Sequence, residues 1–250
     1  MACHRYFCDK IDAAMCELSA EESHHAASVI RAREGDTVEV FDGRGTVADA
    51  TVSEVTRQSV HVVVARRWPQ APEPHPSLSL QVAVPKGSRP RVLVEKCTEL
   101  GVNVIQPIVT GRSAVRPRAS VVSRWRRYAI EAAKQSRQAW LPRIQPPLAF
   151  DQSIETGRIG LDEETLNLIA SPGANARPLA AVLRDAAAAG GLMHVAIWIG
   201  PEGGFTPDEM TGAMATGLQP VSLGTAVLRI ETAAIAAVAA MRLGQLTIRD

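Results

Sequence analysis

The spacing of hydrophobic residues in the first quarter of the chain is that of β-strands. Between residues 36 and 65, apolar and polar positions alternate in DTVEVFDG and GTVADATVSEV, which flank a turn at Asp42-Gly43, and SVHVVVA follows after a short break. Strands this short and this close together predict a small β-barrel or sandwich. A helix is expected before them over residues 19–32, because Ser19 and Glu22 have the spacing of a capping box.

A proline-rich stretch ends this part of the chain. WPQAPEPHPS (residues 68–77) has four prolines in ten residues, a composition typical of a linker. We therefore expect a first domain over residues 1–70, a linker over 71–77 and a second domain over 78–250.

The second domain alternates apolar strand patterns with helix patterns. Regular β–α alternation predicts a mostly parallel sheet covered by helices on both faces. Thr206, Pro207 and Glu209 form a capping box with proline at the first helical position, and Gly101 and Gly244 follow two of the helices as stops. The expected strands are 78–85, 102–109, 165–171, 194–200 and 220–224, and the expected helices are 89–101, 120–140, 177–189, 207–216 and 231–243.

The charge of the chain is unevenly distributed. The net charge of the 250 residues is +1, but residues 84–143 hold 13 Lys and Arg against three acids, and the remainder holds 14 against 23. A basic surface suited to a polyanion is one explanation, and a set of solvated helix faces is the other.

The cysteines and the apolar runs indicate in which compartment the protein functions and whether a metal site or a membrane span is expected. The four cysteines form no CxxC pair, and no signal peptide is recognisable, so we expect a reduced, cytoplasmic protein. Cys3, His4, Cys8, His24 and His25 do not have zinc-site spacing, and no metal is expected. The longest apolar run, AAIAAVAAM, is too short to cross a bilayer.

Two glycine-bearing turns follow predicted strands, which is where parallel sheets bind ligands. GPEGGF begins at residue 200 and LGTAVLRIETA at residue 223; neither is a Rossmann or a Walker sequence. Glu202 would repel a phosphate, so a cationic nucleoside without phosphate, such as S-adenosylmethionine, fits this turn better. The alternative is that the glycines serve tight turns and Glu202 caps a backbone group.

Two further sets of residues have both a structural and a functional interpretation. Glu231 could complement a helix dipole with Arg229 as its surface partner, or Arg229 could hold an anionic substrate or the cofactor carboxylate. Trp125 and Tyr128 could stack on a base, but their helical spacing favours core packing.

Several stretches, in this order, resemble the RsmE-type ribosomal RNA methyltransferases. They are PKGSRPRVLVEKCTELGV, GRSAVRP, AAKQSRQAWLP, IGPEGGFTPDE and LGTAVLRIETA, and HRYF near the start is similar too. The family methylates N3 of a uridine in 16S rRNA and is part of the SPOUT superfamily. The resemblance implies an α/β fold in which a PUA-like RNA-binding β-barrel precedes a SPOUT parallel sheet with a trefoil knot. It also implies a cytoplasmic homodimer that binds S-adenosylmethionine and the small ribosomal subunit, with no membrane partner.

The resemblance also assigns roles by position. Lys134 departs from the family pattern, which has an acid there, and this puts a catalytic role for the position in doubt. The implied catalytic residues are Arg229, Arg5 and Glu202. The implied RNA contacts are Arg5, Lys86, Arg112, Arg116, Arg118, Gln135 and Arg137. The implied cofactor contacts are Ala170, Pro172, Ile199, Gly200, Pro201, Glu202, Gly203, Ser222, Leu223, Gly224, Val227, Leu228 and Arg229.

The implied reaction is methyl transfer from the sulfonium to N3 of uridine. Arg229 or Arg5 would stabilise negative charge on the base carbonyls, and Glu202 and Glu231 are the candidate bases. A SPOUT methyltransferase of another RNA or base and a non-catalytic RNA-binding module remain alternatives. A phosphate-cofactor enzyme is disfavoured because the turn has a glutamate and no lysine.

Overall fold

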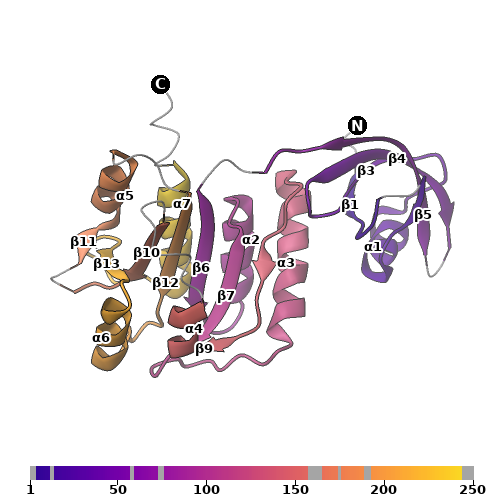
Figure 1. Ribbon diagram of the computed structural model, residues 1–250. Coiled ribbons are helices and arrows are strands. Elements are labelled where there is room, and N and C mark those ends of the chain that lie inside the picture. Colours follow the sequence, from indigo (N-terminus) through magenta and orange to yellow (C-terminus); the bar gives the residue numbers. More distant parts are fainter. Residues whose placement is uncertain are drawn as a thin grey trace. The chain divides into compact units, whose positions relative to one another are not determined.

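The computed structural model describes residues 4–11, 14–56, 59–72, 76–156, 165–173, 176–188 and 193–243. Its internal contacts divide the chain into two compact units (Figure 1). The N-terminal unit consists of Met1–Pro72 together with Ile130–Leu141, and the C-terminal unit consists of Glu73–Ala129 together with Pro142–Asp250. The expected linker falls partly outside the described residues, because residues 73–75 are not among them.

The N-terminal unit is built on a five-stranded sheet with the order β1-β3-β4-β5-β2. β1 runs parallel to β3, and the other neighbours are antiparallel. The predicted strands and the predicted helix are confirmed, although the helix changes after one turn to π-helical hydrogen bonding. The elements are β1 (His4–Phe7), β2 (Met15–Glu17), α1 (Ala20–His24), η1 (His25–Ile30), β3 (Thr37–Phe41), β4 (Thr46–Val55) and β5 (Val60–Pro69).

Part of the core of this unit comes from a distant segment of the chain. Ala133 and Ala139 pack with Phe7, Phe41 and Val47 in one buried cluster. Backbone hydrogen bonds fasten the same segment to the turn between β3 and β4, from Gly45 N to Ala139 O (3.1 Å) and from Leu141 N to Gly43 O (3.0 Å). The N-terminal unit is therefore not a continuous stretch of sequence.

The helix that supplies this segment, α3 (Val121–Ser136), is five residues shorter than the expected 120–140. It ends because Arg137 adopts a left-handed conformation with φ 59°, which a helix cannot continue through. The residues after it are free to pair with the sheet, and Trp140 forms a β-bridge with Arg44.

A buried ion pair joins α3 to α1. Nζ of Lys134 lies 3.0 Å from Oε1 of Glu22 and 3.0 Å from Oε1 of Glu131, and both Lys134 and Glu22 are almost fully buried. Burial raises the pKa of Glu22, and Lys134 opposes that rise. The lysine that departs from the family pattern therefore has a structural partner in this chain.

Replacing Lys134 by methionine is expected to lower the free energy of unfolding by about 2 kcal/mol near neutral pH, because Glu22 is left as an uncompensated buried charge. This loss of stability is smaller than the loss usually caused by removing one partner of a buried ion pair, because Glu22 can take up a proton. A carboxyl group with a raised folded-state pKa stabilises the fold at low pH and loses that contribution as the pH rises through the folded pKa. The deficit of the variant should therefore be small near pH 4 and grow as the pH rises.

Urea denaturation of both proteins at several pH values would measure this effect. The matched control is the double variant Glu22→Gln/Lys134→Met, which removes both charges and should recover most of the loss. A deficit that is the same at every pH would contradict the assignment to Glu22.

The C-terminal unit contains the parallel sheet expected from the alternation of strands and helices. Its order is β11-β13-β10-β12-β6-β7-β8, with β9 also paired to β7, and every pairing is parallel. The short elements β8, β9, β11 and α4 were not expected. The strands are β6 (Ser77–Ala83), β7 (Val104–Val109), β8 (Arg143–Ile144), β9 (Leu148–Ala149), β10 (Thr165–Ala170), β11 (Arg177–Pro178), β12 (His194–Ile199) and β13 (Gln219–Ser222). The helices wholly within it are α2 (Arg89–Glu99), α4 (Phe150–Thr156), α5 (Leu179–Ala188), α6 (Pro207–Ala215) and α7 (Ile230–Leu243).

Helices cover both faces of this sheet (Figure 1). α4 and α6 pack on a face that includes Ile108, Ile169 and Trp198, while α7 contacts α2, β6 and β12. The chain thus returns from β13 past two strands to the middle of the sheet. Gly244, the expected stop of α7, lies outside the described residues. None of the described helices has the length and hydropathy needed to span a membrane.

Candidate functional site

Three turns at the carboxyl ends of β10, β12 and β13 enclose a cavity of about 210 Å³. Every residue expected to bind the cofactor lines this cavity except Ser222 and Arg229. Ligand pockets in proteins commonly measure about 300–1,000 Å³, so a nucleoside-sized ligand would fill this one and extend beyond it. The lining comprises Ala170, Ser171, Pro172, Ile199, Gly200, Pro201, Glu202, Gly203, Gly204, Leu223, Gly224, Ala226, Val227, Leu228 and Ala233.

The turn after β12 is shaped by its glycines and by the helix that follows. A Cβ at Gly200 would lie only 3.0 Å from the ring of Phe205, and Gly204 has φ 67°. The capping box is confirmed: Thr206 N donates to Oε2 of Glu209 (2.7 Å), and Glu209 N donates to Oγ1 of Thr206 (3.2 Å). α6 therefore begins at a defined point and holds the end of the turn in place.

The loop that contains Gly111 and Arg112 forms hydrogen bonds to this turn and to the helix after it. Nη1 of Arg112 donates to the carbonyl oxygens of Gly203 (2.8 Å) and Phe205 (3.2 Å). Gly111 N donates to Oε1 of Glu209 (2.7 Å), the capping carboxylate. Two stretches of the family resemblance, GRSAVRP and IGPEGGFTPDE, thus meet here. Arg112, expected to contact RNA, is engaged in supporting the turn.

The acidic residues of the site share one cation. Nη1 of Arg89 lies 3.3 Å from Oε1 of Glu202 and 3.9 Å from Oε1 of Glu231. Arg89 was not expected to have a role, and it takes the place that one interpretation gave to Arg229 as the partner of Glu231. Arg229 is exposed, and its carbonyl oxygen accepts the first hydrogen bond of α7, from Ala233 N (2.8 Å).

Arg5, expected to contribute to catalysis and to RNA binding, is buried inside the N-terminal unit. Its guanidinium lies 4.4 Å from the centre of the Phe41 ring, and its Nε is 3.0 Å from Oε1 of Glu39, although not aligned for a hydrogen bond. Its Nη1 donates to Ala133 O at 3.4 Å. With only 6% of its side chain exposed, Arg5 holds the sheet together and presents almost no surface to RNA.

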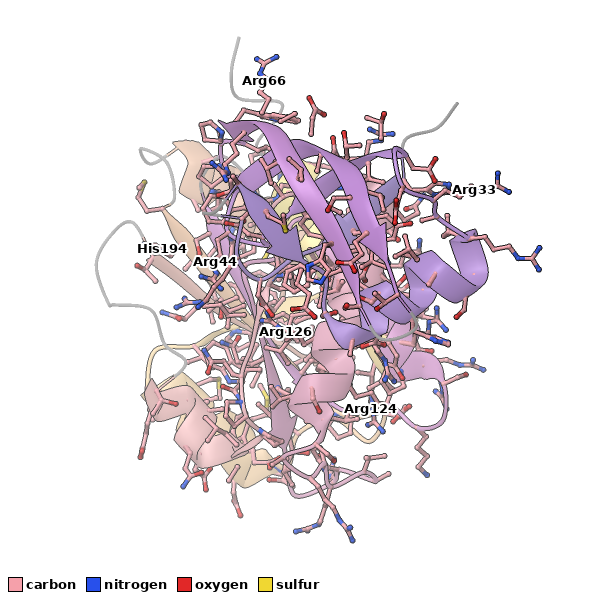
Figure 2. All side chains as sticks on the ribbon, turned by 90° about the vertical axis from the view of Figure 1, so that its right-hand side faces the viewer. Arg33, Arg44, Arg66, Arg124, Arg126 and His194 are labelled. Atoms are coloured by element: carbon pink, nitrogen blue, oxygen red, sulfur yellow. The ribbon has the colours of Figure 1, made fainter. Side chains whose placement is uncertain are left out.

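The other residues expected to contact RNA are exposed within their own units. Lys86, Arg116 and Arg118 are exposed in the C-terminal unit, and Gln135 and Arg137 in the N-terminal unit. Figure 2 shows two further cations of the N-terminal unit, Arg33 and Arg66, whose side chains extend away from the ribbon.

The aromatic residues of the basic segment have structural partners. Trp125 is fully buried, which confirms the interpretation of core packing. Tyr128 lies beneath the guanidinium of Arg91, 5.8 Å from the ring centre. A base would therefore not meet the ring of Trp125 in this arrangement.

A second cavity, of about 570 Å³, lies among Ser79, Gln81, Gln106, Arg143 and His194. Its buried amides already have protein partners. Gln106 Nε2 donates to the carbonyl oxygen of Pro146. The side chain of Gln81, with its amide reoriented, satisfies both ends against Ser79 and Ile197. The glycine-turn cavity is therefore the stronger candidate for a ligand site.

Comparison with known proteins gives two family matches, one in each part of the chain. Residues 72–242 match a family described as the RNA methyltransferase domain, and residues 18–65 match the RNA methyltransferase PUA domain. Two proteins named ribosomal RNA small subunit methyltransferase E are similar. The one from Synechocystis sp. is 34% identical over 92% of this chain and 74% of its own length, and the one from Mycobacterium bovis is 32% identical over 94% and 88%.

A solved structure with the same name, from Neisseria gonorrhoeae and bound to S-adenosyl methionine, has a TM-score of 0.83 and 27% identity. The match covers 97% of this chain and 98% of that one.

Proposed function

This chain belongs to the RsmE-type family of ribosomal RNA methyltransferases, and from that premise we propose that it methylates N3 of a specific uridine in 16S rRNA of the small ribosomal subunit with S-adenosylmethionine as methyl donor. The observation that carries the proposal is the cavity enclosed by three glycine-bearing turns. It lies where parallel sheets bind ligands, and most of the residues that the resemblance assigns to the cofactor line it.

The lining fits a cationic nucleoside better than a nucleotide phosphate. Among the described residues that line the cavity, Glu202 is the only ionisable one, and none is a lysine or arginine that could hold a phosphate. The backbone groups of Ile199–Gly204 and Leu223–Leu228 would hold the cofactor, which supplies an electrophilic methyl group when bound. The carboxylate of Glu202, with 43% of its side chain exposed, can face the positive end of such a ligand.

The residues of this chain would contribute orientation and charge stabilisation. N3 of uridine must lose its proton, and negative charge then develops on the base carbonyls. Arg229, exposed beside the cavity residue Leu228, is the cation we assign to that charge. Arg5 is withdrawn from this role because its guanidinium is buried against Glu39.

RNA binding would use both units. Lys86, Arg116, Arg118, Gln135 and Arg137 are exposed and would contact phosphates, with affinity that falls as salt rises. We also propose a cytoplasmic homodimer. It is supported by the family likeness and by the alanines of α7 that are not buried in this chain, Ala236, Ala239 and Ala240, whose small side chains would permit close approach of a partner.

The test is incubation of the protein with undermethylated small subunits and labelled S-adenosylmethionine, followed by nucleoside analysis of the RNA. We expect label in 3-methyluridine of 16S rRNA. Label in another nucleoside, or preferential labelling of another RNA, would support a SPOUT methyltransferase of different specificity. If calorimetry finds no binding of S-adenosylmethionine or its demethylated product, the cofactor assignment is wrong.

A further inference from the structure

Three charged residues from distant parts of the chain meet beside the glycine-turn cavity. Arg89 is the first residue of α2, Glu202 lies in the turn after β12, and Glu231 is the second residue of α7. The guanidinium of Arg89 lies 3.3 Å from the carboxylate of Glu202 and 3.9 Å from that of Glu231, through the same nitrogen.

The position of Arg89 is not explained by the helix that it begins. The amino end of a helix has a partial positive charge, so a cation there is unfavourable for α2. The same rule favours Glu231 at the start of α7. Arg89 therefore depends on the two carboxylates for its stabilisation, and it is the one cation that the described residues place within ion-pair distance of both.

Arg89 stabilises the ionised carboxylate of Glu231 more than that of Glu202. Glu231 is 9% exposed, and its Oε2 is buried without a hydrogen-bond partner among the described residues. A carboxylate in that environment is costly when unpaired. Glu202 is more exposed to solvent. Its ion pair with Arg89 therefore contributes more to fixing the position of the turn than to compensating a buried charge.

The two carboxylates are attached to two walls of the cavity. Glu202 is within the turn of Ile199–Gly204, and Glu231 is the second residue of α7, the helix that follows the turn containing Leu223–Leu228. Resting on the proposed function, we propose that Arg89 is a positioning residue that clamps these two walls together and so preorganises the cofactor pocket. Preorganisation raises affinity because less freedom is lost on binding.

The clamp predicts a specific pattern of binding. Arg89→Met should weaken binding of S-adenosylmethionine and of S-adenosylhomocysteine about tenfold each, because both ligands need the same pocket walls. The ratio of the two affinities should stay within about threefold. Arg89→Lys should recover part of the affinity, because it keeps the charge but loses the planar fork.

Arg91→Met is the matched control on the same helix. Arg91 is exposed and pairs with Glu95 (2.6 Å), away from the cavity lining, so its removal should leave both affinities unchanged. Calorimetry with both ligands measures the affinities, and thermal melting of each variant identifies any loss of folding. Unchanged binding in Arg89→Met would overturn the clamp. So would a gain for S-adenosylmethionine alone, which would indicate a charge effect, because loss of the cation would free Glu202 to attract the cationic ligand.

Hydrogen exchange of the ligand-free protein tests the clamp without any cofactor. In Arg89→Met the amides of residues 200–206 and 223–233 should exchange faster than in the wild type, while those of β7 stay protected. If the wild type binds neither ligand but this exchange pattern is seen, the proposed function fails and the clamp stands. Unchanged exchange in both segments contradicts the clamp, whatever the wild type binds.

Discussion

Replacing Arg229 by alanine is expected to lower the rate of methyl transfer about a hundredfold, the usual effect of removing one donor to a developing oxyanion. The fold should be almost unaffected, because the side chain of Arg229 is exposed and only its carbonyl oxygen takes part in α7. Single-turnover rates on small subunits, with thermal melting of the same preparations, measure both quantities.

The matched control for this prediction is Arg184→Ala, which removes an exposed arginine from α5 of the same unit. We expect it to change neither rate nor stability. Arg229→Lys should fall between wild type and alanine, because lysine keeps the charge without the fork. Parallel loss of rate and melting temperature in Arg229→Ala would instead show that the residue serves the start of α7.

Gly45→Ala is expected to reduce the free energy of unfolding of the N-terminal unit by about 4 kcal/mol, as the sum of backbone strain and overpacking. Gly45 has φ 98°, which an L-residue rarely adopts, and its added Cβ would overlap the indole ring of Trp140. The backbone cannot move away easily, because Gly45 donates to Ala139 O and accepts from Gln70 N (2.7 Å). Denaturant unfolding followed by tryptophan fluorescence would measure the loss.

Two comparisons separate the causes of that loss. Gly35→Ala introduces a Cβ at φ 91° with no atom within 4 Å, so it should show the backbone cost alone, about 1–2 kcal/mol. In a Trp140→Ala background the cost of Gly45→Ala should fall to the same value. If it does not, the contact with the indole is not the cause.

The elements were predictable from sequence wherever local patterns determined them. Alternation located β3, β4 and β5, and the capping box of Thr206 and Glu209 fixed the start of α6, because these signals depend on neighbouring residues. The end of α3 was misplaced because nothing in its apolar spacing marks Arg137 as left-handed. Arg137 is left-handed where the chain leaves the helix. The residues after it then pair with strands that lie about 95 positions earlier in the sequence.

The backbone turns of the site could be predicted from the sequence, but the ion pairs among its charged side chains could not. GPEGGF and LGTAVLRIETA identified two cavity walls, because glycine-rich turns after parallel strands have a local signature. Arg89 meets Glu202 and Glu231 across more than one hundred residues of sequence, a distance over which spacing carries no information. The burial of Arg5 could not be predicted either, because its partner Glu39 is on a neighbouring strand that only the register of β1 and β3 places opposite.

The discontinuity of the N-terminal unit affects how the chain folds as it is made. Proteins are synthesised from the amino end, and domains usually fold in that order as they emerge from the ribosome. In this protein Phe7 and Phe41 lack their alanine partners until residues 133–139 have emerged, by which time about a third of the C-terminal unit, residues 73–129, is also outside. The domain that is synthesised first must therefore complete this part of its core late, after the segment that carries Ala133 and Ala139 has been made.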